Sequence, residues 1–291
     1  MRPALCQPSE MPQYDDNSFS PPRRRHRLVI IPLLIAGVVM LYQYFGAEKF
    51  VNPETGKAAH VALSSAQESL LGLQSYHEVL SQSEVVKSGL EVEMVRRVAG
   101  KLSAVVATGE QYDWQVSLVR SPEVNAFCLP GGKIVVYTGI LPVAKTEAGL
   151  ATVMGHEIAH ATSRHGSQRL LQGKLTSTLM LGANAAVGLG DMDPQQKQMV
   201  LGALGAGTQF GVLLPFSRGH ETEADEIGLL YMARAGYDPQ EAIHFWERMS
   251  GVGGRQPPQF MSTHPAHGTR IERLKELLPK AQLEYQRALG K

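Results

Sequence analysis

The chain has 291 residues, a formal net charge of +1 at pH 7 and 43% hydrophobic residues. This length suits one sizeable domain with additional segments, and it provides ample mass for a hydrophobic core. A net charge so close to zero gives no basis for a nucleic-acid partner, and we expect none. The two cysteines do not make a disulfide framework.

Residues 1–27 are predicted to form a disordered, basic tail. Pro, Ser, Asp and Asn are frequent in residues 1–22, and an arginine cluster follows at residues 23–27. The next stretch, residues 28–45, is apolar and near the length that spans a bilayer. Positive charge before such a run is typical of the cytoplasmic side. We therefore predict a transmembrane signal anchor at residues 28–46, which would contact the lipid bilayer.

Other interpretations of the apolar run fit less well. A cleaved signal peptide needs small residues at its end, where Tyr44 and Phe45 stand. A lipoprotein signal needs a cysteine after the run, whereas Cys6 precedes it. We expect a single-pass protein of a bacterial inner membrane, with a cytoplasmic N-terminus and the remaining chain in the periplasm. A mitochondrial intermembrane space is not distinguished by these physical arguments.

A linker is predicted at residues 47–64. Helical patterns at residues 57–82, which overlap the end of this linker, and at residues 83–107 come next. From Trp114 the hydrophobic period changes from helical to alternating, which predicts a strand to residue 120. Residues 125–129 and 133–137 are also extended, with a tight turn at residues 130–132. A small sheet is thus expected directly before the next helix, and its open edge could accept a peptide as an added strand.

Residues 146–164 form a helix-forming run that contains the sequence His156-Glu157-Ile158-Ala159-His160. Residues four apart share a helix face, so both histidines can bind one metal ion. Glu157 is close enough to hold a water on that ion. Zinc suits imidazole and carboxylate ligands, and a catalytic zinc keeps one position open for water. The pattern predicts one Zn²⁺ per chain, with Glu157 as the general base.

A second helical run, residues 219–235, supplies the expected third ligand. Glu221 and Asp225 are four residues apart and share a face. We predict that Glu221 binds the metal and that Asp225 accepts a hydrogen bond from the far nitrogen of a ligand histidine. Glu223 and Glu226 are expected on the solvent face.

The metzincin type of zinc site is disfavoured. It would require a third histidine ten residues after His156, preceded by a glycine three residues earlier. This chain has Gly166 and Ser163 at those positions, and His165 is out of register.

Between the second and third ligands lie two apolar runs rich in Gly and Ala, at residues 172–189 and 199–216. Each falls in the length range shared by core helices and membrane-associated helices. We predict a helical hairpin packed in the core, with a lid over the site or a membrane contact as alternatives.

Ser262-Thr263-His264-Pro265, followed by Arg270, is the last candidate for chemistry. A histidine and an arginine near a helix start could stabilise the oxyanion formed when water attacks a carbonyl. Taken alone, the stretch favours a surface histidine beside a proline. The loop at residues 251–258 is a plausible hinge. A helix is expected to residue 278, followed by a short tail at residues 280–291.

Together these three motifs resemble the M48 family of zinc metallopeptidases, in particular its Oma1/BepA/LoiP-like branch of periplasmic and mitochondrial-inner-membrane proteases. The resemblance covers residues 65–279 and implies a gluzincin-type domain of the α+β class, mainly α, with a small sheet beside the His-Glu-x-x-His helix. It further implies that His264 can approach the zinc and hold the enzyme inactive. Asn125 and Ala126 would border the cleft as weak substrate contacts.

The function hypothesis is therefore a membrane-anchored zinc metalloendopeptidase. Its expected partners are unfolded or misfolded proteins of the envelope or membrane, which it would remove in quality control. A membrane-tethered chaperone or assembly factor with little proteolytic turnover is the alternative, because a complete metal site says nothing of turnover. A purely structural zinc site is disfavoured, since such sites favour cysteine and close all four positions. The oligomeric state is left open.

Overall fold

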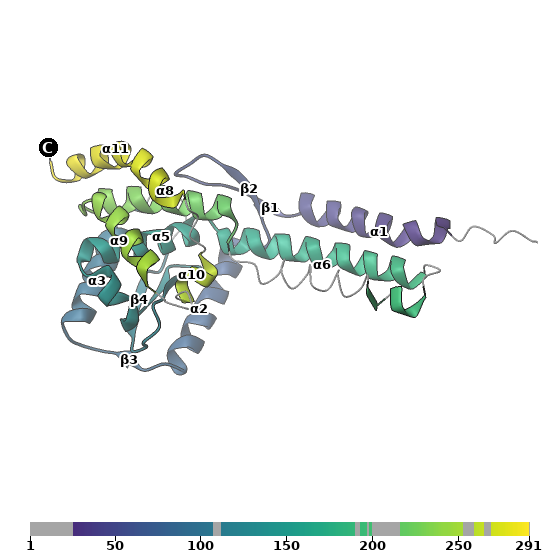
Figure 1. Ribbon diagram of the computed structural model, residues 1–291, viewed down its shortest axis with the longest axis horizontal. Helices are drawn as coiled ribbons and strands as arrows, with labels where there is room; N and C mark the ends of the chain where they lie inside the picture. The colour runs from purple at the N-terminus through teal and green to yellow at the C-terminus, as the bar shows by residue number, and fades with distance from the viewer. Residues whose placement is uncertain are drawn as a thin grey trace, which may run out of the picture.

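The computed structural model describes residues 26–106, 112–189, 193–196, 198–199, 216–252, 259–264 and 269–290. It is mainly helical with two small sheets, which confirms the predicted α+β class. Figure 1 shows a body that contains most elements and a long arm of two helices, α1 (His26–Phe45) and α6 (His165–Leu189), that projects from it. Residues 1–25 of the tail predicted at residues 1–27 lie outside the described residues.

The two arm helices approach each other closely at Gly182 of α6. A Cβ atom at Gly182 would lie 2.4 Å from the Cβ of Ala36 and 2.9 Å from the carbonyl oxygen of Pro32, both in α1. Only glycine fits at such a separation, and helices that pack on small residues can come this near. The outward side of α1 leaves large apolar side chains exposed, among them Leu34 and Val38 at 63% and 67%.

The apolar run of residues 28–45 is helical as predicted, but its assignment as a membrane span is not supported. Within the described residues, no helix is both long enough and apolar enough to cross a bilayer.

The predicted linker at residues 47–64 is instead an antiparallel hairpin of β1 (Glu48–Val51) and β2 (Ala58–Val61). Helix α2 (Ser65–Ser81) therefore begins later than the helical pattern from residue 57 predicted. Ser64 sets this start, because its side chain accepts a hydrogen bond from the backbone N–H of Gln67, while the Gln67 side chain accepts one from the backbone N–H of Ser64.

The body contains a four-stranded sheet with the strand order β3-β4-β6-β5. Its strands are β3 (Val85–Val86), β4 (Gln115–Val119), β5 (Ala126–Leu129) and β6 (Lys133–Tyr137). Strands β4 and β6 run parallel, and the other pairs are antiparallel. The three strands expected from residue 114 onward are confirmed, as is the turn, where Gly131 and Gly132 take positive φ angles of 77° and 86°. The sequence patterns did not predict strand β3. Strand β5 is an edge of the sheet, because it pairs with β6 alone among the described strands.

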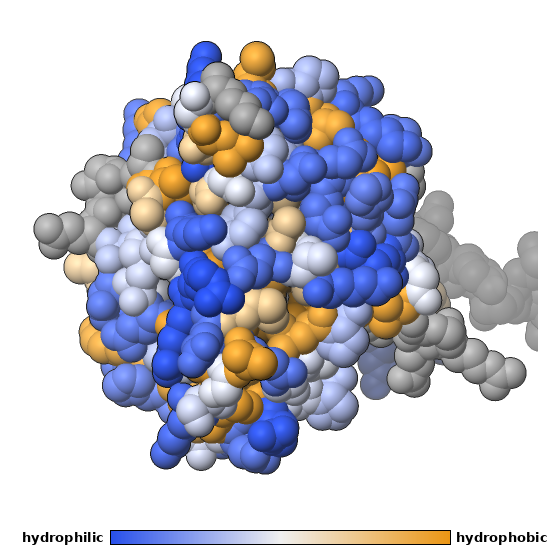
Figure 2. Space-filling view, turned by 90° about the vertical axis from the view of Figure 1, so that its left-hand side faces the viewer, coloured by the Kyte–Doolittle hydropathy of each residue, from blue (hydrophilic) through white to orange (hydrophobic). Residues whose placement is uncertain are grey.

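The remaining helices enclose one hydrophobic core above this sheet. They are α3 (Leu90–Ser103), α4 (Leu141–Ala144) after the short 3₁₀ helix η1 (Thr138–Ile140), α5 (Glu147–Thr162), α8 (Arg218–Arg234), α9 (Gln240–Gly251), α10 (Gln259–Thr263) and α11 (Arg270–Ala288). Helix α5 is central, and nearly all its residues are buried. The face of the body opposite the arm is largely hydrophilic with separate apolar patches (Figure 2).

Two further sequence predictions need correction. The first apolar run, residues 172–189, belongs to α6 and packs on α1, so it does not enter the main core of the body; residues 200–215 of the second run lie outside the described residues. Helix α11 does not end near residue 278, because Pro279 sits on its exposed side while Leu274 and Ala281 anchor it to the body.

Candidate metal centre

Helix α5 carries His156 and His160 side by side in the interior. Thr146 caps the helix by accepting a hydrogen bond from the backbone of Gly149. The two histidines are 2% and 4% exposed, and their Nε2 atoms lie 3.1 Å apart. Such convergence of two imidazole nitrogens is the arrangement that the four-residue spacing predicted.

Helix α8 brings Glu221 to the same point. Ser217 caps this helix and places Glu221 in its first turn. The carboxylate oxygens lie 3.3 Å from His160 Nε2 and 3.5 Å from His156 Nε2. One turn later, the Oδ1 atom of Asp225 lies 2.9 Å from His156 Nδ1, the far nitrogen of that ring. The structure thus places both α8 carboxylates where the sequence expected a ligand and its supporting partner.

His264, at the end of α10, is the fourth member of the cluster. Its Nδ1 atom lies 3.0 Å from Glu221 Oε1 and 3.2 Å from His156 Nε2, while its Nε2 atom is 3.4 Å from Glu157 Oε1. It is 3% exposed, so the alternative of a surface histidine is wrong. The donor atoms of His156, His160, Glu221 and His264 all lie within 4.8 Å of one another.

These separations fit a tetrahedral metal ion. Ligands bonded at about 2.0–2.1 Å to a tetrahedral centre are about 3.3 Å from each other. Five of the contacts between these donor groups, counting either oxygen of Glu221, run from 3.0 to 3.5 Å, and the four donors together lie within 4.8 Å. Three imidazoles and one carboxylate are also the chemistry that such a site requires. The residues present therefore can hold one metal ion.

The charge balance of the cluster favours a cation. Burial alone would raise the pKa of Glu221, but hydrogen bonds from His156, His160 and His264 hold that pKa far below its ordinary value. Burial lowers the pKa of His160 well below its ordinary value, which favours the neutral ring that a metal ligand must present. Burial raises the pKa of Glu157, whose Oε1 atom finds no hydrogen-bond partner among the described residues.

Arg270 faces the carboxylates of the cluster. Its guanidinium donates to Asp225 Oδ2 at 2.7 Å and to Glu221 Oε2, and it stacks 4.0 Å from the ring centre of Trp246. The coulombic attraction of both carboxylates raises its pKa against the effect of burial. This placement makes Arg270 a partner of the Glu221 and Asp225 carboxylates, and the predicted contact with a substrate oxyanion stays a prediction.

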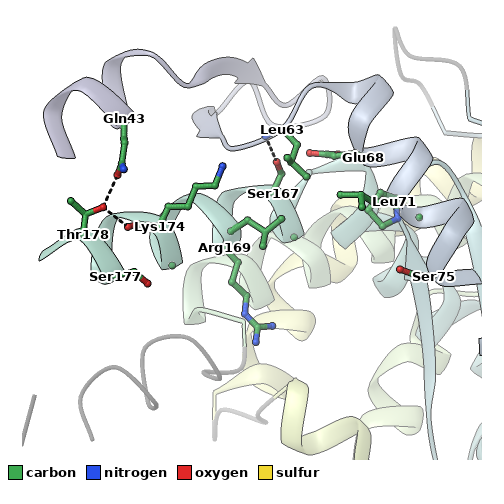
Figure 3. A pocket seen from close by; sticks show the side chains of 15 residues that line it. Gln43, Leu63, Glu68, Leu71, Ser75, Ser167, Arg169, Lys174, Ser177 and Thr178 are labelled. Atoms are coloured by element: carbon green, nitrogen blue, oxygen red, sulfur yellow. Dashed lines mark hydrogen bonds between the residues drawn. The ribbon is translucent and has the colours of Figure 1, made fainter. Parts of the chain in front are cut away.

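A cavity of about 340 Å³ opens beside Glu157 and His264. Asn125 and Ala126, the two predicted substrate contacts, line it together with edge strand β5. A second cavity of about 700 Å³ lies between α2 and α6 and shares the lining residues Glu68, Pro130, Gly166 and Ser167 with the first. Figure 3 shows this second cavity, and it labels Glu68 and Ser167, two of the residues that line both cavities. The candidate metal centre therefore lies next to the smaller of these two cavities, through Glu157, His160 and His264.

Sequence reasoning missed two residues next to the site. Glu223 was expected in solvent, yet it is 8% exposed and accepts hydrogen bonds from Asn52 and Thr55 of the β1–β2 turn. His165 is fully buried, with its Nδ1 atom 3.0 Å from His160 Nδ1. The prediction for Glu223 was wrong because its partners lie far away in the chain, where no local pattern reveals them.

Comparisons with known proteins agree with this geometry. The family model described as peptidase family M48 matches residues 90–278, which include all four donor residues. The mitochondrial metalloendopeptidase OMA1 of Schizosaccharomyces pombe is 36% identical over 92% of this chain and 77% of its own length. The OMA1 protein of Saccharomyces cerevisiae is 37% identical over 60% of this chain and 50% of its own length.

A bacterial relative is similar over a comparable stretch. The beta-barrel assembly-enhancing protease of Escherichia coli K12 is 28% identical over 75% of this chain and 45% of its own length. The chain thus spans about half the length of this relative and of the Saccharomyces protein. With the motif helices, the four converging donors and these similarities in place, the chain belongs to peptidase family M48 and is a metalloendopeptidase.

Proposed function

We propose that the protein is a zinc-dependent endopeptidase that cleaves unfolded or misfolded polypeptides in protein quality control. The observation that carries the proposal is the convergence of His156, His160 and Glu221 next to a buried Glu157 and an open cavity. Zinc is the expected ion because the donors are nitrogen and oxygen atoms at tetrahedral separations.

The chemistry follows from the positions of the chain's own groups. Zinc held by His156, His160 and Glu221 would lower the pKa of a bound water toward neutrality and polarise the substrate carbonyl. Glu157 takes a proton from the attacking water and delivers it to the leaving amine. Its raised pKa, caused by burial, suits a group that must both accept and release a proton near neutral pH.

The substrate is proposed to bind as an extended strand. Strand β5 is a sheet edge that lines the 340 Å³ cavity beside Glu157. A peptide paired with that edge would gain backbone hydrogen bonds without regard to its side chains. Asn125 and Ala126, at the start of β5, are the proposed contacts. Such pairing selects unfolded chains, since only they present a free extended backbone.

His264 is proposed to control access to the metal. With its Nδ1 atom among the ligand donors, it occupies the position that a catalytic zinc leaves to water. Hydrolysis then requires His264 to move away. The alternative, in which it steadies the oxyanion, calls for a ring that faces the substrate carbonyl instead.

We also propose that the arm contacts lipid at a bacterial inner membrane, with the body on the periplasmic side. The support is the set of apolar α1 side chains more than half exposed, such as Ile30, Ile35 and Leu41. Exposed apolar patches of this kind mark interaction surfaces. Flotation of the full-length protein with liposomes tests this, and recovery of the protein in the lipid-free fraction would reject it.

The catalytic proposal is tested with Glu157→Gln. The variant should retain zinc but lose cleavage of unfolded casein by a factor of about 10² to 10⁴, the usual contribution of general acid–base catalysis. Glu226→Gln, a surface change on α8, is the matched control. Full cleavage by Glu157→Gln would reject the base assignment. A zinc-bound wild type that prevents aggregation but never cuts would favour the chaperone alternative.

A further inference from the structure

His165 forms a contact with a proposed zinc ligand that the mechanism above does not use. Its Nδ1 atom lies 3.0 Å from Nδ1 of His160, and the residue is fully buried. His160 turns its Nε2 atom toward Glu221, at 3.3 Å. A histidine that binds a metal through Nε2 keeps its proton on Nδ1, and this N–H group needs a hydrogen-bond acceptor. Nδ1 of His165 stands at that place as the acceptor.

Glu223 stands behind His165. If Nδ1 of His165 accepts, its Nε2 carries the other proton, and Nε2 lies 3.7 Å from Glu223 Oε2. That Nε2 atom is buried and has no hydrogen-bond partner among the described residues. The Glu223 carboxylate is therefore the negatively charged group beside the ring's second nitrogen.

The turn of the β1–β2 hairpin fixes Glu223 in place. Its Oε1 atom accepts hydrogen bonds from Asn52 Nδ2 at 2.9 Å and from the Thr55 hydroxyl at 2.7 Å. This leaves Oε2 for His165 and for Lys57, each at 3.7 Å. Asn52 is 3% exposed and also donates to Ser163 at the end of α5, at 2.8 Å. The buried side-chain amide of Asn52 thus connects the β1–β2 hairpin to the end of α5 and to Glu223.

We propose that His165 and Glu223, held by Asn52 and Thr55, are positioning residues that orient His160 for metal binding. They would do for His160 what Asp225, 2.9 Å from Nδ1, does for His156. The β1–β2 hairpin thereby becomes a functional part of the metal centre. This inference rests on the proposed zinc site.

The test compares zinc affinity across three full-length variants, measured by competition with a chromogenic chelator. Glu223→Gln keeps an oxygen for Asn52 and Thr55 but presents an N–H₂ group to His165. It should weaken zinc binding about 10- to 100-fold, the usual effect of losing such a partner. Thr55→Val removes one hydrogen bond at a half-buried site and should weaken binding in the same direction by a smaller factor. Glu226→Gln should bind like the wild type.

Two further readouts separate positioning from folding. The visible absorption bands of the Co²⁺-loaded protein should change in Glu223→Gln, because they report ligand geometry, while the Tm of metal-free protein should stay near the wild-type value. Should Glu223→Gln fail to fold, Thr55→Val decides the question. Wild-type zinc affinity and Co²⁺ spectra in folded variants would overturn the inference. A wild type without zinc affinity would instead overturn the proposed function.

Discussion

At the scale of single residues, Glu221 holds the centre together. Its two oxygens contact His160, His156, His264 and Arg270, all of them buried. Removal of this carboxylate would leave the Arg270 charge with Asp225 alone, and breaking a buried ion pair typically costs about 3–5 kcal/mol. The same side chain therefore serves both as a proposed ligand and as a counter-charge that the fold needs.

His264→Ala distinguishes the two roles open to His264. Because its Nδ1 atom stands among the donors, we expect the variant to bind zinc more weakly and to cleave unfolded casein faster than the wild type. A role in oxyanion stabilisation predicts the opposite, an activity loss of about 10² to 10³ with unchanged zinc affinity. His244→Ala, on the exposed side of α9, is the control for removal of a histidine.

At the scale of elements, the site depends on how closely α5 and α8 cross. A Cβ atom at Gly228 of α8 would lie 2.8 Å from the backbone nitrogen of His156, and one at Gly155 would lie 2.9 Å from the carbonyl oxygen of Gly228. Both obstacles are backbone atoms, which cannot rotate away. This crossing brings the ligand histidines of one helix within reach of the carboxylates of the other.

Gly228→Ala should therefore push the two helices apart. We expect a loss of about 1–3 kcal/mol in the free energy of unfolding, typical of overpacking, and weaker zinc binding because Glu221 and Asp225 move away from α5. Gly100→Ala in α3, where a Cβ atom meets nothing within 4 Å, is the matched control and should not reduce stability. Urea unfolding and chelator competition measure the two effects. Unchanged zinc affinity in a destabilised Gly228→Ala would show that the crossing sets stability alone.

At the scale of the whole molecule, the proposed metal joins parts that are distant in sequence. His160, Glu221 and His264 come from α5, α8 and the end of α10. Ligand binding to the folded state alone stabilises it by about 4 kcal/mol at a thousandfold excess over Kd. A chelator should accordingly lower the Tm, and Zn²⁺ but not Mg²⁺ should restore it. A Tm that changes with neither chelator nor zinc would argue against a bound metal.

The local parts of this site were predictable and the long-range parts were not. His156 with His160, and Glu221 with Asp225, follow from four-residue spacing on helices, and alternation gave the strands from residue 114 onward. By contrast, Glu223 and Asn52 are 171 residues apart, and no periodic pattern in the sequence predicts their hydrogen bond. The role of Pro279 was also misjudged, since a proline on an exposed helix face removes a hydrogen bond at little cost to packing.

One feature of the chain between α5 and α6 limits how the sequence can change. Only Ser163 and Arg164 separate the two helices, and Arg164 takes a positive φ of 54°. One inserted residue would turn α6 by about 100° about its axis. His165 would then lose its contact with His160, and Gly182 would no longer face α1. The fold therefore fixes the length of this corner, because one added residue would break contacts at both ends of α6.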